Sequence, residues 1–352
     1  MNNNTSIIIL AAGLGTRMKS KRPKVLFELC GEPMIIHILK QAYAITNDVS
    51  VVLHYEKELI SKKIKEIFPQ TKIFEQDLAN FPGTAGAIKG VNLSGEKVLV
   101  TCGDMPLVRS TDLMRLANAE ADVVMSSFEV ANPFGYGRVI IKNGKVEAIV
   151  EQKDASEAQL AIKSVNAGCY CFKREALEQI LPLISNQNAQ KEYYLTDAIK
   201  IANEKGLKCV AVNVNEQNFM GINDKFQLSI AEKIMQDEIK QNLMKAGVLM
   251  RMPESIFIDS RAKFEILNAV ANELLAQKEA IKAANAKDLA NGEKSGLSAA
   301  LLDRLRLTDA RIEAMAKGVR EVAGFAEVVG ENLGGWSHPN GMQISRIRVP
   351  LG

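Results

Sequence analysis

The first part of the chain alternates short apolar runs with amphipathic stretches. The apolar runs are rich in β-branched residues and predict strands, and the stretches between them repeat apolar residues at helical spacing. The predicted strands cover residues 7–10, 49–54, 71–74, 97–101 and 122–130, and the predicted helices cover 33–46, 56–68, 84–91 and 110–119. This alternation predicts an α/β sheet wound in the Rossmann manner, with ligands beyond the carboxyl ends of its strands.

Between residues 138 and 172 the pattern changes to consecutive strands. Residues 138–141 and 146–150 flank Asn143-Gly144, a two-residue hairpin signal, and residues 164–172 alternate as a further strand. We expect these strands to form a small antiparallel extension over the mouth of the sheet. Helices near 173–184 and 195–205, a strand at 208–214 and a long helix from about 224 to 246 follow.

The pattern changes again near residue 264, where the chain becomes rich in alanine and predicts helices. One expected apolar stripe contains Leu267, Val270, Leu274 and Ile281. Thr308 is placed to cap a further helix, whose apolar residues are Ile312, Met315, Val319 and Val322. Asn340-Gly341 followed by alternation over 343–349 predicts a strand. The expected organisation is a domain at 1–223, a long helix and connector at 224–264, and a mainly helical segment at 265–352.

Composition excludes several classes of protein. The 352 residues are 47% hydrophobic, and 44 basic against 41 acidic residues give a net charge of +3, which favours neither nucleic acid nor a membrane surface as partner. No signal peptide or long apolar run is present, so we expect a cytoplasmic protein. Five cysteines without C-x-x-C spacing and three histidines argue against a zinc site.

A glycine loop follows the first predicted strand and points to a polyphosphate ligand. Gly13 and Gly15 allow backbone N–H groups to approach phosphate oxygens, and cations that would offset the ligand's charge stand within the next residues. They are Arg17, Lys19, Lys21, Arg22 and Lys24. The loop is no Walker-type P-loop, and Met18 occupies the position where a dinucleotide fingerprint requires glycine.

Two polar side chains at the expected ligand edge have alternative interpretations. Asp104 follows the fourth strand and suits Mg²⁺, which takes only one or two protein oxygens, but an aspartate there can also cap a turn. Asn223 stands before the long helix and could be its N-cap. Lys24 could be one member of a solvated basic run.

Polar groups in the extension could hydrogen-bond a sugar. They are Gly137 in the sequence Gly135-Tyr136-Gly137-Arg138, Glu151 after the hairpin, and Asn166 in Asn166-Ala167-Gly168. Each of them taken alone is equally compatible with a satisfied surface or turn residue.

The ordered set of motifs resembles the bacterial sugar-nucleotide pyrophosphorylases. The motifs are L-A-A-G-x-G-T-R-M with P-K-V-L, then G-T-A-G-A, G-D-M-P-L, G-Y-G-R, V-E-Q-K-D-A, N-A-G, E-Y-Y-L-T-D and G-I-N. Over residues 5–264 the chain is most similar to the N-terminal uridylyltransferase half of the bifunctional N-acetylglucosamine-1-phosphate uridylyltransferase/glucosamine-1-phosphate acetyltransferase. The resemblance implies a nucleotide-diphospho-sugar transferase fold.

The resemblance also implies the reaction and its residues. UTP and N-acetylglucosamine 1-phosphate would give UDP-N-acetylglucosamine and pyrophosphate, with Mg²⁺ held by Asp104 and Asn223. Arg17 and Lys24 would steady the phosphates as the catalytic pair. The implied substrate-binding residues are Leu10, Ala11, Ala12, Gly13, Lys24, Gln76, Gly83, Thr84, Cys102, Gly103, Gly137, Glu151, Asn166 and Asn223. Such a transfer needs positioning and charge neutralisation and no protein nucleophile.

Two features depart from the family pattern. Six residues (77–82) separate Gln76 from Gly83-Thr84, where the family usually has four. The bifunctional enzymes continue into a left-handed β-helix of hexapeptide repeats, which also forms their trimer interface, and residues 265–352 contain no such repeat. We therefore expect no acetyltransferase activity, and the oligomeric state stays open. The alternatives are transfer to another sugar phosphate or from another nucleotide, and a non-catalytic sugar-nucleotide binder.

The last segment has a resemblance of its own. Residues 284–289, 296–305, 307–311 and 346–352 are similar to the N-terminal part of γ-glutamyl phosphate reductase, whose catalytic cysteine and NADP-binding segments lie further along that family's sequence. This implies no reductase activity here, and it indicates a junction of two unrelated coding sequences or an engineered fusion. We hypothesise that the apolar stripes of the segment lack their usual partner, which would leave it loosely docked, self-associating or disordered.

Overall fold

The computed structural model describes residues 4–142, 144–245, 248–324, 332–337 and 343–347. The chain divides between Phe257 and Ile258 into two compact units. The described residues of the N-terminal unit form a nine-stranded sheet with the order β11-β7-β10-β6-β1-β4-β5, to which the hairpin β8–β9 is attached through β10. Its strands are β1 Thr5–Leu10, β4 Val49–Leu53, β5 Lys72–Glu75, β6 Lys97–Cys102, β7 Val123–Glu129, β8 Arg138–Lys142, β9 Lys145–Val150, β10 Ser164–Lys173 and β11 Cys209–Asn213.

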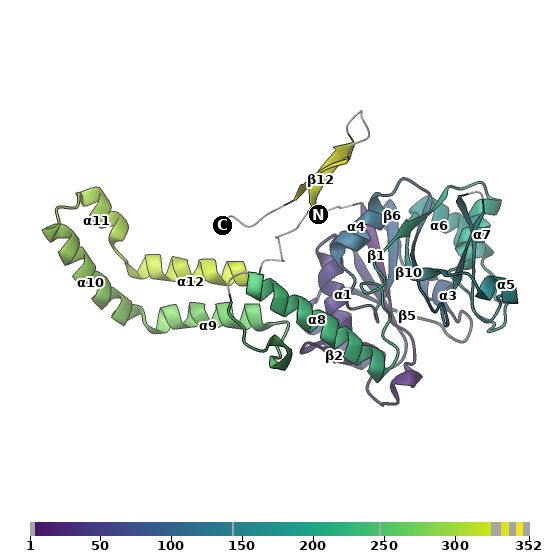
Figure 1. The fold of residues 1–352 in the computed structure, drawn as a ribbon, viewed down its shortest axis with the longest axis horizontal. Helices are drawn as coiled ribbons and strands as arrows, with labels where there is room; N and C mark the ends of the chain where they lie inside the picture. Colours follow the sequence, from purple (N-terminus) through teal and green to yellow (C-terminus); the bar gives the residue numbers. More distant parts are fainter. Residues whose placement is uncertain (1–3, 143, 246–247, 325–331, 338–342, 348–352) are drawn as a thin grey trace. The chain divides into compact units, whose positions relative to one another are not determined.

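Helices cover both faces of this sheet (Figure 1). Alternate residues of β1 point to opposite faces, so that Ile7 and Ile9 join one apolar cluster and Ile8 joins the other. The first cluster includes side chains of α1, α2 and α4, and the second includes side chains of α3, α6 and α7. The helices are α1 Met34–Tyr43, α2 Lys57–Ile67, α3 Thr84–Ile88, α4 Ser110–Asn118, α5 Glu157–Leu160, α6 Arg174–Ile180, α7 Asp197–Glu204 and α8 Lys225–Lys245.

The predicted α/β, Rossmann-like sheet is confirmed. The strands β6, β1, β4 and β5 are parallel, so their carboxyl ends meet at one edge. A short ribbon of β2 Glu28–Leu29 and β3 Glu32–Pro33 lies between the first loop and α1. The predicted turn residue Asn143 lies outside the described residues, but the strands on either side of it pair as expected.

The prediction that residues 164–172 belong to the antiparallel extension was wrong for most of this strand. β10 pairs with β8 only near Val165, whereas its second half lies antiparallel between β6 and β7 in the main sheet. Cys169, Tyr170, Cys171 and Phe172 are all buried because helices and strands cover this half of β10 on every side. The strand therefore connects the extension to the centre of the sheet.

The described residues of the C-terminal unit form four helices and one antiparallel hairpin. The elements are α9 Ala262–Ala276, α10 Lys278–Lys294, α11 Ala299–Leu305, α12 Asp309–Gly324, β12 Asn332–Ser337 and β13 Gln343–Ile347. Thr308 caps α12 as predicted, because its Oγ1 accepts a hydrogen bond from the Arg311 N–H at 3.2 Å. Residues 340–342 and 348–349 of the predicted terminal strand lie outside the described part.

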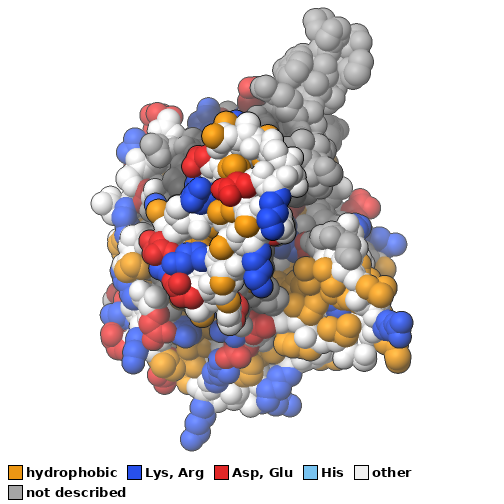
Figure 2. All heavy atoms as spheres, turned by 90° about the vertical axis from the view of Figure 1, so that its left-hand side faces the viewer, with side chains coloured by type: hydrophobic (Ala, Val, Ile, Leu, Met, Phe, Trp, Pro, Cys, Tyr) orange, Lys and Arg blue, Asp and Glu red, His pale blue; other side chains and the backbone are white. Residues whose placement is uncertain are grey.

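The predicted apolar stripes of the C-terminal unit are only partly buried. Of the predicted residues whose side chains are described, Ile312 is buried, whereas Val270 and Met315 are 45% and 47% exposed. Ala271 and Ala316, which lie outside the predicted stripes, are also buried. Val322, the last residue of the second predicted stripe, lies outside the side chains that the structure describes. Figure 2 shows hydrophobic side chains exposed between charged ones, and Leu297, Leu301 and Leu305 are such residues at α11 and the turn before it. Within the described residues, none of the helices has the length and hydropathy needed to cross a bilayer.

Candidate active site

A cavity of about 490 Å³ opens where β1 and β6 end, within the size range of small-molecule sites. The two strands are paired in register up to Leu10 and Cys102, so the loops that follow them start side by side. Twelve residues that the sequence assigned to the site line this cavity: Leu10, Ala11, Ala12, Gly13, Arg17, Lys24, Gln76, Gly83, Thr84, Cys102, Asp104 and Asn223. Gly103 lies beside it, where a Cβ would stand 3.0 Å from the Cβ of Ala11.

The glycine loop folds back onto Lys24. Gly15 has a φ of +62°, and a Cβ there would lie 2.7 Å from the Lys24 Cβ, so only glycine fits. Two short 3₁₀ turns, Thr16–Met18 and Lys24–Leu26, shape the loop. The Lys24 side chain is only 14% exposed, whereas Lys19 and Lys21 are exposed. Lys24 is therefore no ordinary member of a solvated basic run.

Lys24 joins two side chains that are distant in the sequence. Its Nζ donates to a carboxylate oxygen of Asp104 and, at 3.2 Å, to the Oδ1 of Asn223. The guanidinium of Arg17 donates to the same Asn223 oxygen at 2.8 Å. Two accepting side-chain oxygens and two cations thus converge at the cavity.

The N-cap interpretation of Asn223 was wrong. The Oδ1 of Asp224 accepts a hydrogen bond from the Gln227 N–H at 2.8 Å, so Asp224 caps α8. The Asn223 backbone N–H is bound by the side chain of Gln227 at 2.7 Å. The Asn223 side chain is therefore not used as the helix cap, and it lines the cavity.

Asp104 and Asn223 fit a small hard cation. Their oxygens lie close enough to contact a single ammonium nitrogen, and a Cβ built on Gly221 would be 4.0 Å from Asp104 Oδ1 and 3.9 Å from Asn223 Nδ2. Within the described residues, no cluster of three or more histidine, cysteine or acidic side chains could hold a metal. One carboxylate and one amide oxygen suit Mg²⁺, because this ion usually takes only one or two protein oxygens and keeps water and phosphate in its remaining positions.

The six residues after Gln76 fold into a compact turn. The Asp77 carboxylate accepts from the Asn80 N–H at 3.1 Å, and the Asp77 carbonyl accepts from the Phe81 N–H at 2.8 Å. Gln76 Nε2 donates to the carbonyls of Phe81 at 3.0 Å and Gly83 at 2.9 Å. The longer spacing is absorbed by this turn, and Gln76, Gly83 and Thr84 line the same cavity.

Gly137, Glu151 and Asn166 form a second cluster and do not line this cavity. The Asn166 N–H donates to the Gly137 carbonyl at 2.9 Å, and a Cβ on Gly137 would lie 3.4 Å from Glu151 Oε1. The Thr196 hydroxyl donates to the same Glu151 oxygen at 3.2 Å. Burial of the carboxyl raises the pKa of Glu151 above its usual value, and the Thr196 hydrogen bond opposes that change.

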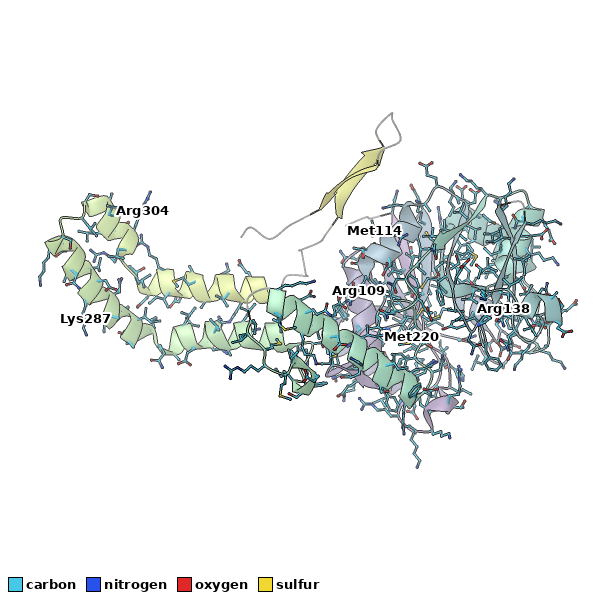
Figure 3. The ribbon with its side chains drawn as sticks, viewed as in Figure 1. Arg109, Met114, Arg138, Met220, Lys287 and Arg304 are labelled. Atoms are coloured by element: carbon cyan, nitrogen blue, oxygen red, sulfur yellow. The ribbon has the colours of Figure 1, made fainter. Side chains whose placement is uncertain are left out.

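Buried Arg138, labelled in Figure 3, holds the loop of this second cluster. Its guanidinium donates to the Tyr136 carbonyl and to the side-chain oxygen of Gln152 at 3.3 Å. The same Gln152 oxygen accepts from the Gly135 N–H at 2.5 Å. The loop before Gly137 is thereby tied to the turn that follows Glu151.

One segment borders both clusters, and its residues were missed as site residues. The Tyr193 carbonyl accepts from Ala85, and the Leu195 N–H donates to the Thr84 hydroxyl at 3.0 Å. Glu192 lines the cavity, and Thr196 contacts Glu151. The motif E-Y-Y-L-T-D signalled this segment. Gly15 of the predicted glycine loop also lines the cavity, and further lining residues without a sequence assignment are Leu14, Thr16, Val25, Leu78 and Ala87.

Cys102 lines the cavity but is no nucleophile. Burial, and then the charge of Asp104, raises the pKa of its thiol well above the usual value, so the thiol stays protonated at neutral pH. Among the described residues, the site therefore offers cationic side chains, side-chain oxygens and backbone groups, and no protein nucleophile.

Comparison with known proteins assigns the chain to a family. Residues 7–192 match the MobA-like NTP transferase domain. The chain belongs to this family. The bifunctional protein GlmU of Campylobacter concisus is 99% identical over 265 residues, which are 75% of this chain and 61% of that protein. GlmU of Campylobacter curvus is 88% identical over 263 residues. The chain thus spans about three fifths of the length of these relatives.

A solved structure shares the fold of the NTP transferase domain. A putative glucose-1-phosphate thymidylyltransferase from Bacillus anthracis superimposes with a TM-score of 0.50 at 18% sequence identity, over 65% of this chain and 94% of that one. At this identity the likeness concerns the fold alone.

Proposed function

We propose that the N-terminal unit is a Mg²⁺-dependent uridylyltransferase that forms UDP-N-acetylglucosamine and pyrophosphate from UTP and N-acetylglucosamine 1-phosphate. The observation that carries the proposal is the convergence of Lys24, Arg17, Asp104 and Asn223 beside the glycine loop, in one cavity with Gln76, Gly83 and Thr84. The first group of residues would bind the triphosphate, and the second would bind the base. The family and the near-identity to GlmU proteins support the assignment.

The chemistry requires no covalent intermediate on the protein. An oxygen of the sugar phosphate attacks the α-phosphorus of UTP, the bond from that phosphorus to the β-phosphate oxygen breaks, and pyrophosphate leaves. Arg17 and Lys24 would hold the phosphates in line and offset the charge that develops on the leaving group. Backbone groups of Ala12 and Gly13 would bind the nucleotide next to them.

Asp104 and Asn223 would hold Mg²⁺. The ion supplies charge neutralisation to the phosphates when bound. In the structure the Lys24 ammonium satisfies the same two oxygens. Lys24 would therefore pass from Asp104 to a phosphate oxygen when the substrates bind.

Gln76 would select the base, and the second cluster would select the sugar. Because both Nε2 hydrogens of Gln76 are used by backbone carbonyls, its Oε1 is the end left to accept a hydrogen bond. Uracil presents the N3–H donor that such an acceptor requires. Gly137, Glu151, Asn166 and Thr196 would bind the hydroxyl and N-acetyl groups of the sugar.

Pyrophosphate release across nucleotides and sugar phosphates tests the proposal. Turnover of UTP with N-acetylglucosamine 1-phosphate and Mg²⁺ is expected to be fastest. Preference for another pair would replace the substrate assignment within the same class. Binding of UDP-N-acetylglucosamine without turnover of any pair would leave a sugar-nucleotide binder.

For residues 265–352 we propose an origin in the N-terminal part of a γ-glutamyl phosphate reductase, on the motifs named above, and no second catalytic activity. Their described part consists of helices and one hairpin and belongs to a separate unit. Neither acetyl transfer to glucosamine 1-phosphate nor NADPH-dependent reduction of γ-glutamyl phosphate is expected in direct assays, and either activity would contradict this assignment.

A further inference from the structure

The strand that carries Asn166 is interrupted immediately after it. The pairing of β10 with β7 shifts register between Asn166 and Tyr170, which is the signature of a β-bulge. Gly168 lies inside the bulge with a φ of +84°, a conformation that a β-strand does not otherwise contain. Backbone groups in the bulge therefore lose their partners in the ladder.

A buried serine of the neighbouring strand replaces those partners. The hydroxyl of Ser126 on β7 donates to the Cys169 carbonyl at 2.9 Å and accepts from the Cys169 N–H at 3.0 Å. Ser126 is fully buried, and one hydroxyl thus satisfies both backbone groups of one residue. Each of them would otherwise be a buried polar group without a partner, which is costly.

Two hydrogen bonds fix Asn166, one of them within the bulge. The Asn166 Oδ1 accepts from the Gly168 N–H at 3.0 Å, so the amide is turned with its NH₂ group away from the bulge. The Asn166 N–H donates to the Gly137 carbonyl at 2.9 Å. The geometry of residues 167–169 therefore decides where the donor group of Asn166 lies relative to Glu151.

The bulge also reaches the first cluster. A Cβ on Gly168 would lie 2.9 Å from the terminal methyl of Met105, the residue after Asp104. The Cys169 thiol contacts the Met105 sulfur at 3.9 Å and the Thr101 hydroxyl at 3.1 Å. A shift of the bulge would move the sugar cluster first and press on the loop of Asp104 second.

We propose that Ser126 is a positioning residue of the sugar subsite, which it serves by locking the β10 bulge that presents Asn166. This inference rests on the proposed function. Ser126 does not line the cavity and acts only through the backbone of Cys169. Its effect therefore falls first on the sugar phosphate, through the hydrogen bond between Asn166 and the Gly168 N–H, and reaches the nucleotide site only through the packing of Met105.

The test is the steady-state kinetics of Ser126→Ala in the full chain. The change leaves two buried backbone groups without partners, and relaxation of the bulge displaces Asn166. We expect KM for N-acetylglucosamine 1-phosphate to rise about tenfold, with KM for UTP changed by less than about twofold. The amide hydrogen of Cys169 should exchange faster. Ser50→Ala is the matched control, because Ser50 is a buried serine on β4 that does not line the cavity.

Ser126→Cys covers the case in which the alanine variant fails to fold. A thiol is a weaker donor and acceptor of similar size, so it should show the same selective rise in KM to a smaller degree. An unchanged KM for the sugar phosphate in a folded variant, or an equal rise of both KM values, would overturn the inference alone. A wild-type chain that turns over no sugar phosphate would overturn the proposed function and with it this role.

Discussion

The two units of the chain bury their apolar side chains to very different degrees. The N-terminal unit holds a large apolar cluster on each face of its sheet and a third beneath α8. In the described part of the C-terminal unit, the buried hydrophobic residues are Ala271, Ile312 and Ala316. Its ion pairs, such as Lys282 with Asp309, lie on the surface, where such pairs contribute little.

This difference shows that a segment can form helices without forming a large apolar core. Alanine, lysine and glutamate give the C-terminal segment its helices through intrinsic propensity, but they provide few large side chains to bury. The N-terminal unit places β-branched residues on both faces of its strands and so fixes its loops in position. Chemistry that depends on exact distances is therefore expected from the N-terminal unit only.

Removal of the Asp104 carboxylate should give the largest effect. Asp104→Ala is expected to lower pyrophosphate release by about 1,000-fold, because it removes a metal ligand and the partner of Lys24. The variant should still fold, since Asp104 contributes no core packing. Asp303→Ala in the C-terminal unit is the control and should leave turnover intact. Near-normal activity of Asp104→Ala at limiting Mg²⁺ would refute the metal assignment.

A pair of core substitutions compares the units directly. Ile36→Ala should cost about 3 kcal/mol of unfolding free energy, because Ile36 is fully buried in a large cluster. Ile312→Ala should open the C-terminal helices and leave turnover unchanged. Denaturant unfolding, amide exchange over 258–324 and the activity assay report these outcomes. Loss of turnover in Ile312→Ala would show that the two units are coupled.

Base selection tests how firmly the N-terminal unit holds its loops. CTP should be used about 100-fold less efficiently than UTP, because cytosine offers an acceptor at N3 to the Gln76 oxygen. Gln76→Ala should reduce this preference and raise KM for UTP. Equal use of CTP and UTP by the wild type would mean that Gln76 does not read the base.

The helix cap in the C-terminal unit should give the smallest effect. Thr308→Ala is expected to destabilise α12 by about 1 kcal/mol, because the Arg311 N–H loses its acceptor. Faster amide exchange at the start of α12 with unchanged turnover is the expected result. Strong protection throughout 265–324 in a monomeric protein would refute the hypothesis that this segment lacks a partner for its apolar residues.

The sequence predicts what depends on local pattern. Periodicity located the strands and helices, and the order of the motifs selected the residues that line the cavity. The position of β10 could not be predicted in this way, because alternation defines a strand without naming its neighbours. Likewise, Asn223 could have been a cap until the structure showed that Asp224 takes that role. The contact of Lys24 with Asp104 spans 80 residues and follows only from the sheet order.

The measurement that tests the central claim most directly is the formation of UDP-N-acetylglucosamine by the full chain, followed by mass spectrometry together with pyrophosphate release. With UTP, N-acetylglucosamine 1-phosphate and Mg²⁺, the account predicts equal amounts of both products, and it predicts about 1,000-fold slower formation of both by the Asp104→Ala variant. Absence of UDP-N-acetylglucosamine from the wild-type reaction would contradict it.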